Sequence, residues 1–141
     1  MDHLDFLDAR IAPVSAEIAT RTQPVAETVA RLDTIPGVGR SVAAALVAEI
    51  GVDLTRFPTA KHLASWAGRC PGNHESAGKR RGGTTRKGSP WLRTCLVQAA
   101  HAAARTKGTY LAAQYRRLAA RRGRAKAAVA VAHPIVIIVY H

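Results

Sequence analysis

The stretch 32-LDTIPGVGRS-41 is followed by a run of small apolar residues, 42–50, that ends at Gly51. Gly37 and Gly39 permit a tight turn without Cβ clashes, and the turn exposes backbone N–H groups where a second helix begins. Because the N-terminal end of a helix carries partial positive charge, an anion can bind there. The pattern predicts a helix-hairpin-helix over 32–51 that contacts a phosphate backbone, with a purely structural helical hairpin as the alternative. The predicted contact residues are Gly37, Val38, Gly39 and Arg40.

Charge is distributed unevenly along the 141 residues, whose formal net charge is +12. Residues 1–53 hold four arginines and eight acids, whereas residues 54–141 hold seventeen lysines and arginines and a single acid, Glu75. An anionic polymer is the natural partner of the second half, because each phosphate that a cation neutralises releases counterions. The basic run 116–126 has no acid near it in the sequence, which favours phosphate contact, by Arg116 and Arg117 among others, over a merely solvated helix face.

Hydrophobic periodicity predicts a mainly α fold. Near the N-terminus, apolar residues recur at three- and four-residue steps, which predicts an amphipathic helix that docks on another helix; they are Leu4, Leu7, Ile11, Val14 and Ile18. Further helices are expected from Pro24 to the turn and over 41–50, 59–67, 90–104 and 110–122, with Trp66 in the core. The apolar run 127–140 is too short to span a bilayer and is expected to be a core element.

Between Gly68 and Pro90 the composition changes to Gly, Lys, Arg, Ser and Thr, with six glycines and almost no periodicity. A long basic, glycine-rich loop is therefore expected over 68–90, and such loops are usually functional or disordered. Ser76 is its candidate nucleophile, because a serine that loses its proton can attack a phosphodiester if cations meet the developing charge. Those cations are Lys79, Arg80, Arg81, Arg86, Lys87 and Arg93. From the residues alone, a catalytic Ser76, a basic nucleic-acid-binding loop and a disordered linker all stay open.

The two cysteines, Cys70 and Cys95, are each followed by a histidine, His74 and His101. Such pairs offer zinc ligands, but neither belongs to a C-x-x-C pair, so we expect no metal site in this chain. No signal peptide precedes them, and the expectation is a reduced, cytoplasmic protein.

Several segments occur in the order found in a known family, among them ESAGK at 75–79 and KGSPWLR at 87–93. The others are 32–51, 57–60, 66–68, Pro71 and 130–133. Together they resemble the "IS one-ten" group of bacterial insertion-sequence transposases. The resemblance covers nearly the whole chain, but only the C-terminal part of the family's sequence.

The resemblance implies that the family's serine falls on Ser76 and forms a phosphoserine link to DNA during strand exchange directed by a structured bridge RNA. It implies that residues 1–31 end a coiled-coil linker and that residues 32–141 form a transposase C-terminal domain. Full-length members are expected to be homo-oligomers. Their resolvase-like N-terminal domain carries four carboxylates that bind Mg²⁺, and no cofactor is expected in this chain.

Two departures from the family pattern stand out. The four-carboxylate domain has no counterpart here, since Asp2, Asp5 and Asp8 cannot be assigned to it, and the chain ends at His141 where the family continues its last helix. We therefore expect a fragment of a DNA-binding serine transposase, with DNA and possibly a guide RNA as partners and no membrane contact. The alternative is a nonenzymatic helix-hairpin-helix module that binds nucleic acid without chemistry.

Overall fold

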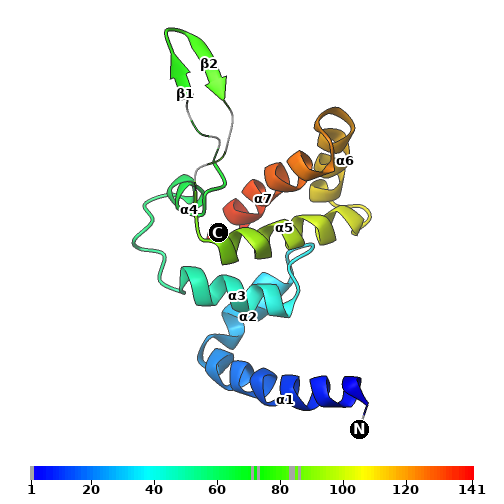
Figure 1. Ribbon diagram of the computed structural model, residues 1–141. Coiled ribbons are helices and arrows are strands. Elements are labelled where there is room, and N and C mark those ends of the chain that lie inside the picture. Colours follow the sequence, from blue (N-terminus) through cyan, green and yellow to red (C-terminus); the bar gives the residue numbers. More distant parts are fainter. Residues whose placement is uncertain (1, 71, 73, 83–84, 86) are drawn as a thin grey trace.

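The computed structural model describes residues 2–70, 72, 74–82, 85 and 87–141. Figure 1 shows a mainly helical protein with one small β-hairpin, which confirms the predicted fold class. The helices are α1 (His3–Thr22), α2 (Ala26–Asp33), α3 (Arg40–Ile50), α4 (Ala60–Trp66), α5 (Pro90–Arg105), α6 (Tyr110–Arg122) and α7 (Arg124–Tyr140), with a 3-10 turn, η1 (Gln23–Val25), between α1 and α2. The strands are β1 (His74–Ser76) and β2 (Lys79–Gly82).

The core is built around α5 and α7. Helix α7 packs against α4, α5 and α6, and the pair α2–α3 joins the same core because α3 packs on α5. Its largest fully buried side chains include Leu63 of α4, Leu96 of α5 and Ile135 of α7. The apolar run 127–140 is therefore a core element, as predicted, and the structure shows it as a helix that continues through Pro134. Among the described residues, no helix combines the length and hydrophobicity that a bilayer crossing needs.

Helix α5 begins at a capped and tethered serine. Ser89 Oγ accepts a hydrogen bond from Leu92 N–H at 3.3 Å and donates one to Glu49 Oε2 at 2.9 Å. Pro90 suits the first helical position because its missing N–H has no partner there in any helix. The bond to Glu49 joins the last turn of α3 to the start of α5, so the helix pair and the segment that leaves the hairpin are held together.

Trp66 is not in the core, and that prediction is wrong. Its side chain is 41% exposed, while Phe57 fills the buried position beneath it at a ring-centroid distance of 5.5 Å. The guanidinium of Arg56 lies over both rings, at 4.6 Å from Phe57 and 5.0 Å from Trp66, and donates to Ile50 O at 2.7 Å. Trp66 therefore covers the corner between α3 and α4 from outside, where a cation–π contact replaces burial.

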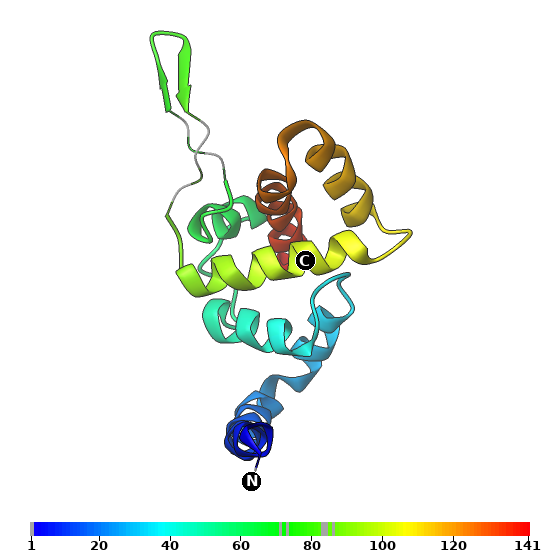
Figure 2. The same cartoon turned by 45° about the vertical axis from the view of Figure 1, so that its right-hand side comes forward.

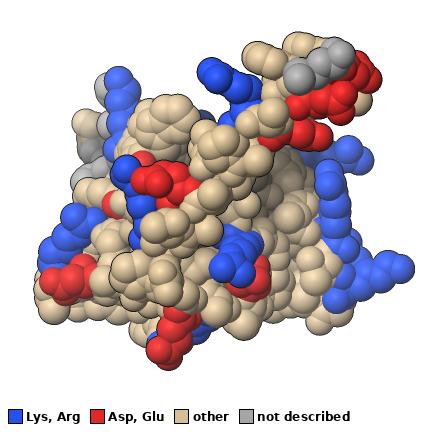
Figure 3. All heavy atoms as spheres, turned by 90° about the horizontal axis from the view of Figure 1, so that it is seen from below, with Lys and Arg blue, Asp and Glu red and all other residues tan. Residues whose placement is uncertain are grey.

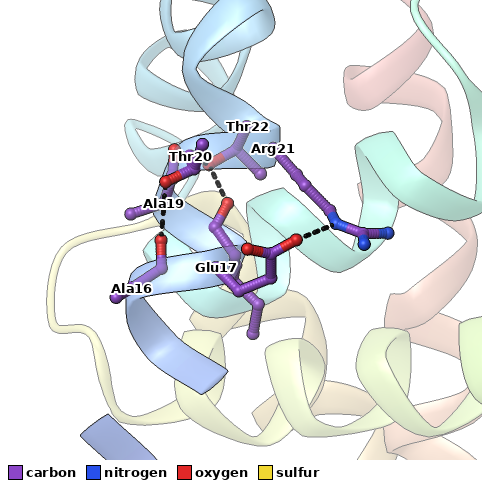
Figure 4. A network of polar contacts seen from close by, with 7 residues as sticks. Ala16, Glu17, Ala19, Thr20, Arg21 and Thr22 are labelled. Atoms are coloured by element: carbon purple, nitrogen blue, oxygen red, sulfur yellow. Dashed lines mark hydrogen bonds and ion pairs between the residues drawn. The ribbon is translucent and has the colours of Figure 1, made fainter. Parts of the chain in front are cut away.

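Helix α1 extends away from the other helices in both ribbon views (Figures 1 and 2). It buries none of its twenty residues, and the apolar positions predicted to dock on another helix are 40% to 67% exposed. Its polar contacts are local: Arg21 pairs with Glu17 at 2.7 Å, and Thr20 Oγ1 donates to Ala16 O at 3.0 Å (Figure 4). The expected docking on another helix is therefore not seen among the residues that the structure describes.

Candidate nucleic-acid interface

The turn between α2 and α3 divides the four predicted phosphate contacts into two inward and two outward residues. Gly37 has φ +88°, and a Cβ there would lie 2.8 Å from Ala103 Cβ and closer still to the backbone of Ala99 and Ala103. Val38 is 1% exposed. The side-chain position of Gly37 therefore faces α5, the Val38 side chain belongs to the core, and the turn packs on α5 rather than standing free.

Gly39 and Arg40 are exposed and begin α3. Gly39 is the N-cap residue with extended backbone, and no described side chain caps this end of the helix. The first N–H groups of an α-helix have no partner within the helix, and the exposed Arg40 belongs to the same turn of α3. An anion can be held at this end, since unpaired N–H groups and the helix dipole both favour negative charge.

Residues 74–82 form an antiparallel β-hairpin within the expected long loop. Ser76 pairs with Lys79 and Glu75 with Arg80, with an irregularity next to His74. Ala77 and Gly78 both have positive φ, 51° and 70°, as a two-residue type I′ turn requires. Figure 1 shows the hairpin projecting from the helical body, with its tip far from the core.

Ser76 is exposed at the last position before this turn, and the exposed Lys79 stands directly opposite it on β2. Opposite residues of an antiparallel pair have Cβ atoms about 4.5–5.5 Å apart, so the hydroxyl and the ammonium group can reach one phosphate together. Arg80 and Arg81 follow on β2. Arg86 lies outside the described residues.

Arg69 lies at the foot of the hairpin, where the sequence predicted no particular role for it. It is 3% exposed, its Nε donates to Ala67 O at 3.3 Å, and its Nη1 has no hydrogen-bond partner among the described residues. Burial lowers the pKa of this guanidinium from its usual value, and the nearby charge of Arg93 lowers it further. Gly88 packs against Ala67 so closely that a Cβ there would come within 2.6 Å of the Ala67 backbone.

Exposed cations surround the start of α5 and cover α6. Lys87 and Arg93 are exposed beside Trp91, which is 75% exposed. The exposed cations of the α6–α7 hairpin are Arg116, Arg117, Arg121, Arg122, Arg124 and Lys126. Within the described residues, both ion pairs lie before α3, Arg21 with Glu17 and Arg31 with Glu27, so the basic half keeps its positive charge uncompensated. Figure 3, seen from below, shows Lys and Arg around the edges of the molecule with acidic groups interspersed.

Among the described residues, no three His, Cys, Asp or Glu side chains lie close enough to share a metal ion. His101 instead contacts the hydroxyl of Tyr115 through Nδ1 at 3.4 Å.

Two comparisons with known proteins agree. Residues 29–116 match the family described as Transposase IS116/IS110/IS902 family. A curated protein of Pseudomonas aeruginosa, described as a probable family 20 transposase, is 34% identical over 105 residues. That alignment covers 74% of this chain and 30% of the relative, so the chain spans less than a third of the relative's length. The matched region includes the turn, the hairpin and α5.

Proposed function

The chain belongs to the IS116/IS110/IS902 transposase family, and from that premise we propose that it is the DNA-contacting part of a transposase whose nucleophile is Ser76. The observation that carries the proposal is the position of Ser76: an exposed hydroxyl at the tip of a projecting hairpin, opposite an exposed lysine. A hairpin tip can enter a DNA groove that a serine on the helical body could not reach.

In the proposed step, Ser76 Oγ gives up its proton and attacks a phosphorus atom of the DNA backbone. A bond forms between Oγ and phosphorus, the bond to one sugar oxygen breaks, and that oxygen takes up a proton. Lys79 meets the negative charge that builds on the phosphate, with Arg80 and Arg81 behind it on the same strand. The result is a phosphoserine link that the freed strand end can later reverse, as strand exchange requires.

Mg²⁺, which the resemblance assigns to the N-terminal domain of full-length relatives, has no fitting set of ligands among the described residues. This chain's proposed share of the chemistry is therefore the nucleophile and the cations around it. Such a reaction on bacterial DNA would take place in the cytoplasm.

Nucleic-acid binding is proposed at two further places. The open N-terminal end of α3, with Gly39 and Arg40, suits a backbone phosphate, and the exposed arginines of α6 suit a second stretch of backbone. Gly37 supports this site from within because it lies close against α5, and the buried Val38 anchors the same turn in the core. A guide RNA is a proposed partner for the same cations, since an RNA backbone offers the same phosphates.

We also propose that α1 pairs with a second copy of itself. Its exposed apolar residues follow steps of three and four, the spacing of a coiled-coil seam, and they stay uncovered by the part of the chain that the structure describes. Ile11→Asp, at the centre of the seam, is expected to shift the chain from dimer to monomer in sedimentation velocity, with the melting of the helical body unchanged. A dimer of undiminished strength would contradict the pairing.

The catalytic proposal is tested by capturing the covalent adduct. The chain is mixed with the N-terminal domain of a full-length relative, Mg²⁺, guide RNA and end-labelled target DNA, and then denatured in detergent. Ser76→Ala is expected to abolish labelled protein, whereas Ser41→Ala, an exposed serine on α3, retains it. An adduct that persists in Ser76→Ala refutes the assignment of the nucleophile.

The second candidate function, a nonenzymatic nucleic-acid module, is favoured by the uncompensated charge of the basic half. It predicts salt-sensitive DNA binding that denaturant removes completely and that Ser76→Ala leaves unchanged. Filter binding over a salt series, before and after denaturation, separates the two functions.

A further inference from the structure

An uncovered tryptophan lies on the first turn of α5. Trp91 is 75% exposed, more than any other large hydrophobic residue among those described, and the neighbouring Pro90 and Thr94 are exposed as well. The next residue, Leu92, is fully buried, so the register of the helix is fixed and Trp91 is held outward. An indole kept in water forgoes a large hydrophobic gain, which marks it as a contact for something outside the chain.

The charge around Trp91 indicates what that contact is. Lys87 and Arg93 are exposed on either side of it in the sequence. The acid that lies near the start of α5 is Glu49, and its carboxylate accepts the hydrogen bond of Ser89 Oγ. A ring flanked by cations matches the two parts of a nucleotide, because the base stacks on the indole while the phosphate pairs with lysine or arginine.

We infer that Trp91 is a stacking platform for an unpaired base, and that Lys87 and Arg93 hold the phosphates of the same strand. This inference rests on the proposed function, since it takes nucleic acid as the partner. A base within a duplex has both faces covered by its neighbours, so the platform requires a single-stranded or unstacked nucleotide. DNA and RNA both offer that chemistry, and the two sources are compared directly in the test.

The test uses the fluorescence of Trp91 itself. The chain has two tryptophans, so Trp66→Phe leaves Trp91 as the sole reporter. The full chain with this substitution is titrated with oligo-dT, with oligo-U and with a blunt DNA duplex of equal phosphate number. A stacked base quenches the indole, and a drop of about twofold or more is expected with one or both single strands but not with the duplex.

Binding constants of variants complete the test. Trp91→Ala is expected to weaken single-strand binding by about 5- to 150-fold, the range found when a stacking aromatic is removed, and to leave duplex binding unchanged. Trp91→Phe restores most of the affinity, because a phenyl ring also stacks. Tyr110→Ala is the matched control: Tyr110 is 68% exposed and also begins a helix. Circular dichroism melts verify that every variant is folded.

Three results overturn the inference. The first is single-strand binding without a change in Trp91 fluorescence, and the second is an equal loss of affinity in Trp91→Ala and Tyr110→Ala. The third is a shift of Trp91 emission on dilution without nucleic acid, which assigns the surface to a second copy of the chain. In each case, the proposed function still stands if the chain binds duplex DNA and forms the Ser76 adduct. A chain that binds none of the nucleic acids would refute both the stacking inference and the proposed function.

Discussion

Replacing Gly37 with alanine tests whether the turn before α3 is a packing device. Alanine at φ +88° costs about 1–3 kcal/mol in backbone strain. The new Cβ would also lie 2.8 Å from Ala103 Cβ and closer still to backbone atoms of α5, which cannot swing aside like the end of a flexible side chain. Overpacking of this kind costs about 1–3 kcal/mol more. We therefore expect Gly37→Ala to lower the free energy of unfolding by about 2–6 kcal/mol.

Two other glycines of the same region separate the two contributions. Gly51 also has positive φ, 81°, but a Cβ there meets nothing within 4 Å. Gly51→Ala is therefore expected to lower the free energy of unfolding through backbone strain alone, by about 1–3 kcal/mol. Gly39 has an ordinary φ of −79° and open space around it. In Gly39→Ala, the poorer N-cap lowers the free energy of unfolding and the reduced entropy of the unfolded chain raises it, so the stability is expected to change little.

Urea unfolding followed by circular dichroism measures these differences. With an m-value of about 2 kcal/mol/M, the midpoint of Gly37→Ala is expected to fall by about 1–3 M. Equal midpoints for Gly37→Ala and Gly51→Ala would show that the turn does not pack closely on α5, and the argument would fail. DNA binding adds a second readout. Gly39→Ala is expected to stay folded but to bind duplex DNA about tenfold more weakly, because the added methyl group keeps the phosphate from hydrogen-bonding distance of the N–H groups.

Three further substitutions test other parts of the structure. Arg69→Met is expected to stabilise the chain by about 1–3 kcal/mol, because it removes a buried and incompletely paired charge; a lower melting temperature would contradict that description. Ser89→Ala should cost about 2 kcal/mol, through the lost cap and the lost bond to Glu49, whereas Glu49→Gln should cost less in the same urea assay. Thr55 lowers the pKa of Asp53 through its hydroxyl and its N–H, so this carboxylate stabilises the fold above its ordinary pKa and ceases to do so as the pH falls through the lower, folded-state pKa. Asp53→Ala should therefore lower the melting temperature at pH 6, and the difference should shrink as the pH falls through the lowered pKa of Asp53.

Periodicity was sufficient to predict helices in the segments that form α1 to α6, since amphipathic and Ala-rich runs depend on local spacing alone. For 127–140 the sequence predicted a core element, and the structure shows that this element is a helix. Periodicity could not predict the hairpin, because strands of three and four charged residues carry no alternation of apolar and polar positions. The residues of the loop made Ser76 a candidate nucleophile, the resemblance implied that role for it, and its placement next to a tight turn came from the structure.

Tertiary contacts explain the remaining differences. Trp66 has the sequence of a core residue, but Phe57 fills the core at that corner and leaves the larger ring outside. Arg69 is one arginine among many in the sequence, and nothing in its local pattern signals that its side chain is buried. The local sequence around Gly37 predicted a phosphate-binding turn but could not show that the turn packs on α5, because the residues that Gly37 contacts lie more than sixty positions further along the chain.

The last turn of α7 constrains the order in which this protein can fold. Tyr140 Oη donates to Phe57 O at 2.9 Å, and α7 supplies the surface on which α4, α5 and α6 pack. During synthesis on a ribosome, the chain is complete through α6 before α7 is made. Until then, the apolar faces of α4, α5 and α6 lack the helix on which they pack. Contacts of such long sequence separation are slow to form. We therefore expect a nascent chain that stops before residue 124 to expose hydrophobic surface, and its assembly to be a late step that completes in one cooperative event once α7 has emerged.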